Sequence, residues 1–155
     1  MQINSRLRVA FVSMATIAEK LQMKDRQEMV VVNPPESFLP VMAELPALTI
    51  HPQLECVEQT GFVLVFVTSK AEVDRLAPLI ATKAPGDAAV WFAYPKATST
   101  RYSCDFNRDT GWDRLAAAGF ETVRAIAIDE DWTALRFRRS EFVKSKSEPA
   151  TDSSK

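Results

Sequence analysis

Two continuous apolar runs dominate the chain, FVLVFV at residues 62–67 and AAVWFAY at residues 88–94. Neither run alternates with polar residues, as a strand with one solvated face would. Such runs are typical of parallel strands whose two faces are both covered by helices. Two shorter runs, MVVV at 29–32 and ALTI at 47–50, predict two further strands of the same sheet.

The segment between the two long runs has a clear helical pattern. Ser69 and Glu72 have the S-x-x-E spacing of a capping box, which satisfies backbone N–H groups at a helix start. Val73, Leu76 and Ile80 then follow at the spacing of one helix face. The sequence therefore predicts a helix that begins after Ser69 and packs on the sheet.

Three more helices are expected from spacing and punctuation. One covers residues 13–23, and a second follows the first strand, with Asn33 as its N-terminal cap. The third covers residues 110–119, with Thr110 as its cap and Gly119 at its end. Strands and helices thus alternate along most of the chain.

The C-terminal third has a different pattern. The runs TVRAIAI at 122–128 and TALRFRR at 133–139 flank an acidic turn at 129–132, which predicts an antiparallel hairpin. In the second run apolar and arginine residues alternate, as in a half-exposed strand. We therefore expect an α/β fold: a Rossmann-like three-layer domain whose mostly parallel sheet is closed by a C-terminal antiparallel hairpin.

The expected organisation is a single domain at 1–139, of which residues 1–22 are an N-terminal extension with a short helix. From residue 140 the sequence is rich in Ser, Lys, Glu and Pro, so 140–155 is predicted to be a disordered tail. A chain of 155 residues is long enough to bury a core without disulfides or metal.

Composition narrows the classes of function. The formal net charge of -1 disfavours nucleic acid as a partner, because phosphate neutralisation needs an excess of Lys and Arg. The apolar runs are too short to span a bilayer, so a membrane is excluded. The two isolated cysteines suggest neither a disulfide framework nor a thiolate metal site, and the expected location is the cytoplasm.

In an open α/β sheet, ligands bind beyond the carboxyl ends of the parallel strands. The first strand here ends in Asn33-Pro34-Pro35 instead of a glycine-rich phosphate turn. The prolines have no N–H and a fixed φ, so this turn cannot fold around a pyrophosphate. The prolines are read mainly as a helix start.

The loop at 94–102, YPKATSTRY, is the most polar strand end and the best candidate for binding an anion or a sugar. Its residue types are equally typical of a solvated surface loop. Together with the other strand ends, it gives the predicted ligand-binding set: Asn33, Thr68, Ser69, Tyr94, Lys96, Thr98, Ser99 and Arg101.

Other reactive residue types favour ordinary structural roles. His51 is the only histidine, which excludes a multi-histidine metal site. Cys104 would be a reactive thiol only if Arg101 or Arg108 lowered its pKa. The acidic run at 129–131 is read as turn chemistry rather than a cation site. The sequence therefore assigns no catalytic residue, no metal and no cofactor.

With these residues placed, the chain resembles a bacterial family known only as domain of unknown function three thousand and fifty-two. The resemblance runs from about Met23 to Arg138 and is carried by a set of strand-end and hairpin residues: Asn33, Pro35, Thr68, Ser69, Trp91, Pro95, Lys96, Asp129, Glu130, Trp132, Leu135 and Phe137. Tyr94 stands where that family commonly has tryptophan. The layout is also similar to the methyltransferase-type Rossmann fold, without its glycine-rich turn.

The missing phosphate turn leads to a first hypothesis: a degenerate, non-catalytic domain, more likely not an enzyme, that binds another protein, a second copy of the chain or a small ligand. The alternative is a nucleotide- or S-adenosylmethionine-dependent transferase that uses the 94–101 loop. A third interpretation is a weak nucleic-acid binder that uses the C-terminal arginines.

Overall fold

The computed structural model describes residues 17, 19–23, 27–44, 49–107 and 109–143. A six-stranded sheet forms its centre, in the order β2-β1-β3-β4-β6-β5. The strands are β1 (Glu28–Val32), β2 (Thr49–His51), β3 (Phe62–Phe66), β4 (Ala89–Pro95), β5 (Phe120–Ala127) and β6 (Trp132–Arg139). The first four strands are parallel, and β6 runs antiparallel to both β4 and β5. The predicted α/β fold with its C-terminal hairpin is confirmed.

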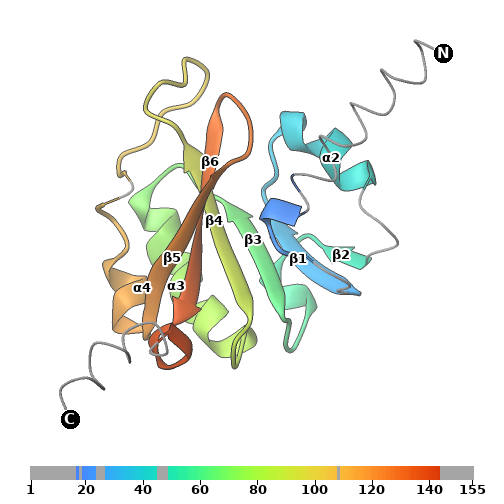
Figure 1. The fold of residues 1–155 in the computed structure, drawn as a ribbon, viewed down its shortest axis with the longest axis vertical. Helices are drawn as coiled ribbons and strands as arrows, with labels where there is room; N and C mark the ends of the chain where they lie inside the picture. The colour runs from blue at the N-terminus through green and yellow to red at the C-terminus, as the bar shows by residue number, and fades with distance from the viewer. Residues whose placement is uncertain (1–16, 18, 24–26, 45–48, 108, 144–155) are drawn as a thin grey trace, which may run out of the picture.

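Helices cover the sheet from both sides (Figure 1). The helices α3 (Lys70–Lys83) and α4 (Asp113–Ala117) lie on one face. A 3-10 turn at Glu36–Phe38 leads into α2 (Leu39–Glu44), which lies on the other face. A second 3-10 turn, Leu54–Cys56, packs next to α3.

The core consists of two apolar clusters, one on each face of the sheet. Successive residues of β3 point to opposite faces, so Val63 and Val65 join the cluster under α3, while Phe62 and Leu64 join the cluster under α2. All five residues of β3 and all seven of β4 are buried. This explains why these two strands show no polar alternation in the sequence.

The start of α3 has the predicted capping box. The Ser69 hydroxyl accepts a hydrogen bond from the N–H of Glu72, and Glu72 Oε1 accepts one from the N–H of Thr68 at 2.7 Å. The helix continues through Pro78 to Lys83. The helix predicted to begin after Ser69 is thus confirmed.

Two predicted helix caps are wrong. Asn33 does not cap the helix after β1; it has φ = 55°, and the helical turn begins only at Glu36. Thr110 does not cap α4, which begins at Asp113; the Thr110 N–H instead donates to Asn107 Oδ1. In both places the polar residue forms a local turn rather than a helix start.

The predicted C-terminal boundary of the domain also differs from the structure. Residues 140–143 form a helical turn in which Val143 is only 6% exposed, so they belong to the folded unit and not to a disordered tail. At the other end Leu21 and Met23 are buried in the core, and the indole N–H of Trp91 donates to Leu21 O at 3.0 Å. Residues 1–16 and 144–155 lie outside the described residues.

Candidate functional site

The carboxyl ends of all four parallel strands meet at one edge of the sheet, which is at the top of Figure 1. The strand β2 pairs on one side of β1, and β3 pairs on the other side. The strand order therefore changes direction at the point between β1 and β3. Such a switch point is where open α/β sheets bind their ligands. Two hollows lie along this edge.

The first hollow, the switch-point pocket, has a volume of about 280 Å³. Its apolar side is formed by Val32, Leu54 and Leu76, and its polar side by four residues: Asn33, Gln53, Glu55 and Arg75. None of these four side chains makes a hydrogen bond or ion pair within the described part of the chain. They are therefore free to meet a ligand.

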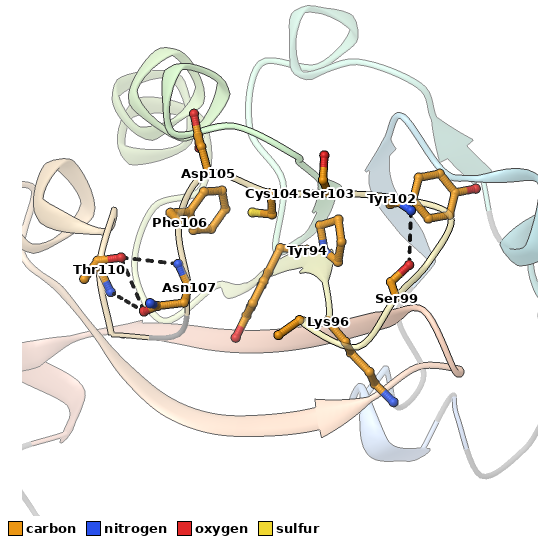
Figure 2. Close-up of a pocket in the computed structure, with 12 residues that line it drawn as sticks. Tyr94, Lys96, Ser99, Tyr102, Ser103, Cys104, Asp105, Phe106, Asn107 and Thr110 are labelled. Carbon is orange, nitrogen blue, oxygen red and sulfur yellow. Dashed lines mark hydrogen bonds between the residues drawn. The ribbon is translucent and has the colours of Figure 1, made fainter.

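The second hollow, the β4 cavity, has a volume of about 540 Å³ and lies beside the loop 96–112 (Figure 2). Its wall includes three aromatic residues, Tyr94, Tyr102 and Phe106. The rest of the lining is Pro95, Lys96, Ala97, Ser99, Ser103, Cys104, Asp105, Asn107 and Thr110. A cavity of this size falls in the range that holds small molecules.

The loop 96–112 is fixed to the domain at both of its sides. Asp105 Oδ1 accepts a hydrogen bond from the N–H of Lys70 at 2.8 Å, which ties the loop to the start of α3. The Ser99 hydroxyl donates to Asp131 Oδ1 at 2.9 Å, which ties it to the β5–β6 turn. The β4 cavity thus has a wall held in place by the surrounding fold.

Aromatic packing supports this wall from behind. The rings of Tyr94 and Phe106 lie 5.6 Å apart, and both contact Trp112. Phe106 also requires a glycine at Gly111, where φ is 91° and an added Cβ would lie 2.7 Å from the Phe106 Cβ. Tyr94 and Phe106 are 7% and 8% exposed, so they form a firm apolar floor.

The predicted ligand-binding residues divide between several locations. Tyr94, Lys96 and Ser99 line the β4 cavity, although the Lys96 ammonium points away from Tyr94 in Figure 2. Asn33 lines the switch-point pocket instead. Thr98 and Arg101 are exposed residues of the same loop as Lys96, and they line neither hollow. Thr68 and Ser69 instead make hydrogen bonds with Glu72 at the start of α3.

Several residues that line the two hollows could not be predicted from the sequence. Gln53 and Glu55 lie in a connection without regular spacing, and Arg75 lies at an exposed helix position. Neither setting gives a residue a sequence pattern of its own. One signal was available: Glu55 follows Asn33 by about 20 residues, the distance at which Rossmann folds place the carboxylate that binds ribose. Phe106 and Tyr102 come together with Tyr94 only through the path of the loop.

The residues considered for other chemistry have structural surroundings. Burial raises the pKa of the Cys104 thiol above its usual value, which is the opposite of an activated cysteine. His51 Nε2 lies 3.3 Å from Glu28 Oε1 on the neighbouring strand. Asp129 Oδ1 accepts from the N–H groups of Asp131 and Trp132, as expected for turn chemistry. Within the described residues no cluster of His, Cys, Asp or Glu fits a metal ion.

The amino end of α3 is filled by groups of the chain itself. The Ser69 hydroxyl accepts from the N–H of Glu72, and the Asp105 carboxylate accepts from the N–H of Lys70. The ammonium of Lys70 is held by Asp74 at 2.9 Å and Asp113 at 3.4 Å. A phosphate would need these same N–H groups and this cation, so this helix start does not offer a phosphate site.

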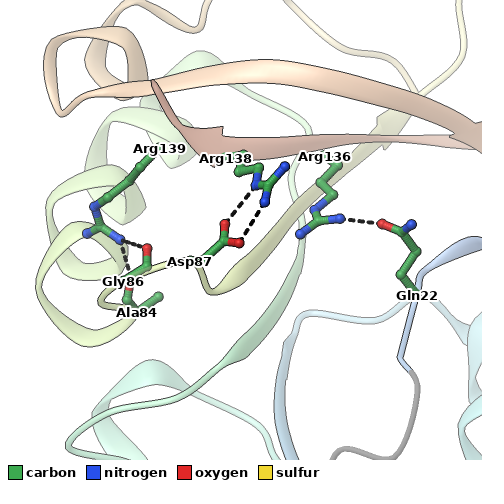
Figure 3. A network of polar contacts seen from close by, with 7 residues as sticks. All are labelled: Gln22, Ala84, Gly86, Asp87, Arg136, Arg138 and Arg139. Carbon is green, nitrogen blue, oxygen red and sulfur yellow. Dashed lines mark hydrogen bonds and ion pairs between the residues drawn. The ribbon is translucent and has the colours of Figure 1, made fainter. Parts of the chain in front are cut away.

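The C-terminal arginines are engaged within the domain (Figure 3). Arg138 makes two hydrogen bonds of 2.8 Å with the carboxylate of Asp87, and Arg136 donates to Gln22 Oε1. Arg139 donates to backbone carbonyls in the last turn of α3 and just after it, including Ala84 O at 2.7 Å. These guanidinium groups hold the hairpin to the rest of the fold.

No family model and no curated protein matches the sequence. Solved structures match the fold with TM-scores of 0.60 for the mitomycin 7-O-methyltransferase MmcR and 0.53 for phosphoethanolamine N-methyltransferase 2 of Haemonchus contortus. Their sequence identities are 12% and 8%; the matches cover 84% and 83% of this chain, but only 54% and 37% of the other chains. The fold is therefore methyltransferase-like, and the chain spans about half or less of the length of these proteins.

This finding corrects the first functional hypothesis. A non-catalytic binding domain was inferred from the missing phosphate turn, but the solved structures that share this fold are named as methyltransferases, so the missing turn does not support a non-catalytic domain. The physical reason for the error is that the missing turn removes only the close backbone approach that glycine allows. It does not exclude a ligand that side chains at the strand ends would hold. Along the described chain no helix is both long and apolar enough to cross a membrane.

Proposed function

We propose that this protein is an S-adenosylmethionine-dependent methyltransferase that binds the cofactor at the switch-point pocket. The observation that carries the proposal is the set of polar side chains there, Asn33, Gln53, Glu55 and Arg75, which have no partner among the described residues. They lie at the switch point of a methyltransferase-like sheet, where a Rossmann-type ligand is expected.

The residues of the pocket fit the chemistry of this cofactor. Glu55 offers carboxylate oxygens to the ribose hydroxyls, and Arg75 offers a planar fork of N–H donors to the methionine carboxylate. Val32, Leu54 and Leu76 supply an apolar surface for the nucleoside. When bound, S-adenosylmethionine supplies an electrophilic methyl group on a sulfonium cation. A pocket of about 280 Å³ holds part of such a ligand and leaves the rest to extend along the edge.

The lack of a phosphate site distinguishes this cofactor from nucleotides. Pro34 and Pro35 have no N–H at the end of β1, and the start of α3 is filled by Ser69 and Asp105. Nucleotides and dinucleotides would place their phosphates against this edge without the backbone N–H donors that a glycine-rich turn supplies. S-adenosylmethionine carries no phosphate and would be held here by side chains instead, since the glycine-rich turn of the methyltransferase-type fold is also missing.

Isothermal titration calorimetry with S-adenosylmethionine, S-adenosylhomocysteine, ATP and NAD tests the proposal. We expect saturable binding of the first two and none of the last two. Glu55→Gln and Arg75→Ala should each weaken binding by about tenfold, since each removes a charge-assisted contact worth about 1.4 kcal/mol. Glu58→Gln, an exposed change that lies outside the pocket, is the matched control. Unchanged affinity in both pocket variants would exclude this site.

Two further statements belong to the same proposal. We assign the protein to the family of domain of unknown function three thousand and fifty-two, on the strand-end and hairpin residues that it shares with that family. We place it in a bacterial cytoplasm, supported by Cys56 and Cys104, which are both free thiols and fit a reducing compartment.

A further inference from the structure

We propose that the β4 cavity is the acceptor site and that it takes a flat aromatic small molecule whose attacking oxygen is already ionised at neutral pH. This rests on the proposed methyltransferase function. The strand β3 lies between β1 and β4, so the two hollows are separated by two strand spacings, roughly 10 Å. A cofactor that extends from the switch-point pocket toward β4 presents its methyl group at this cavity.

The aromatic wall favours a flat aromatic guest. Tyr94 and Phe106 form a buried floor. Tyr102 also lines the cavity, while its ring is turned toward Trp132, 4.9 Å away. Ring faces and edges in such a wall stabilise an aromatic guest beyond simple burial. The volume of about 540 Å³ suits one or two fused rings.

Polar groups of the loop can orient that guest. Asn107 and Thr110 line the cavity at the left of Figure 2, and Ser103 lines it between Cys104 and Tyr102. The Thr110 hydroxyl already donates to Asn107 Oδ1, which leaves the Asn107 amide NH2 group to donate to a ligand oxygen. Such donors stabilise a phenolate oxygen better than a neutral phenol.

Among the described residues, none of the usual candidate bases suits the acceptor. His51 lies on β2, three strand spacings or roughly 14 Å from β4, next to Glu28. Asp105 lines the cavity, but its carboxylate accepts the N–H of Lys70, and a carboxylate is a much weaker base than a phenolate. Cys104 also lines the cavity, but burial raises the pKa of its thiol, so the thiol stays protonated at neutral pH. The acceptor therefore has to arrive without the proton that a general base would remove.

The resulting transfer is balanced without a proton acceptor from the protein. A lone pair of the phenolate oxygen forms the new O–C bond to the methyl carbon. The S–C bond breaks and its electron pair stays on sulfur, so the sulfonium cation becomes a neutral thioether and the phenolate becomes a neutral methyl ether. The chain's own contribution is to hold the ring and to donate hydrogen bonds to the phenolate oxygen.

The test uses the full chain and the probes 4-nitrophenol, phenol and cyclohexanol. Calorimetry without cofactor should show 4-nitrophenol binding at least about tenfold tighter than cyclohexanol. With methyl-labelled S-adenosylmethionine, label transfer to 4-nitrophenol should exceed transfer to the less acidic phenol by at least about tenfold. Equal transfer to the two phenols would overturn the requirement for an ionised acceptor.

Variants that fill the cavity locate the site. Ser103→Trp and, as a second variant, Ala97→Trp place a large ring in the cavity from exposed positions, and each should weaken 4-nitrophenol binding at least tenfold. Thr100→Trp, in the same loop but outside the lining, should leave it unchanged. If both filling variants bind 4-nitrophenol as tightly as the unsubstituted protein, the inference is overturned. Loss of cofactor binding alone would count against the proposed function, because the probe titration contains no cofactor.

Discussion

At the scale of single residues, the surroundings of a side chain decide its chemistry more than its type does. Cys104 follows Arg101 in a polar loop and has the neighbours of an activated thiol in the sequence. In the fold it is half-buried beside Phe106, Asp105 and Glu72, and burial is the main cause that raises its pKa. The ordinary role expected for Cys104 therefore agrees with a thiol that burial holds in its neutral form.

Alkylation tests this difference between the two cysteines. At neutral pH iodoacetamide should modify Cys104 roughly threefold to tenfold more slowly than the exposed Cys56, because only the thiolate reacts. The pKa of the Cys104 thiol is higher in the folded protein than in the unfolded chain. The stability that depends on this thiol being neutral is fully present below the usual thiol pKa, and it is lost as the pH rises through the folded pKa. The Cys104 rate should therefore approach that of Cys56 only at alkaline pH. Mass spectrometry of the two tryptic peptides gives both rates, and a faster Cys104 at neutral pH would contradict the argument.

At the scale of elements, the sheet and its main helix could be predicted, and two of the helix caps and part of the site could not. The apolar runs of β3 and β4 and the capping box of Ser69 and Glu72 are local patterns, so the sequence displays them directly. Asn33 and Thr110 looked like caps because Asn and Thr favour both caps and turns, and tertiary contacts chose the turn.

The residues of the candidate site also divide into those with a local sequence pattern and those without one. Tyr94, Lys96 and Ser99 could be selected because they follow a recognisable strand. Arg75 and Phe106 could not, since they meet the strand ends only after α3 and the long loop have folded back over the sheet. Contacts of high sequence separation leave no local pattern.

The end of α3 gives a prediction at this scale. Arg139 donates to Ala81 O, Ala84 O and Gly86 O, carbonyls at the carboxyl end of the helix, where a cation is favourable. Arg139→Ala should lower the free energy of unfolding by about 1–2 kcal/mol, and Arg139→Lys by nearly as much, because an ammonium cannot reach three carbonyls. Urea denaturation measures both.

The neighbouring arginine is the control for this experiment. Arg138 pairs with Asp87, but both side chains are more than one third exposed, so Arg138→Ala should cost less than about 1 kcal/mol. A larger cost for Arg138 than for Arg139 would show that the surface ion pair, and not the helix end, holds the hairpin to α3.

At the scale of the whole molecule, one sheet joins two cores and presents both hollows at the same edge. The strands β1, β3 and β4 contribute alternate residues to the clusters on the two faces. Neither cluster can lose its packing without exposing strands that the other needs. The spacing between the switch-point pocket and the β4 cavity is therefore fixed by the same strands that form the core.

This arrangement predicts a single cooperative unfolding transition that both faces share. Trp91 lies in the cluster under α2 and Trp112 in the cluster under α3, so variants that keep only one of them, with Phe at the other tryptophans, report on one face each. Their fluorescence transitions in urea should coincide with each other and with far-ultraviolet circular dichroism. Leu64→Ala, which opens a cavity on one face only, should cost about 2–5 kcal/mol and move both reporters equally. Reporters that separate under this substitution would mean that the faces unfold independently, and the two hollows would then not share a fixed frame.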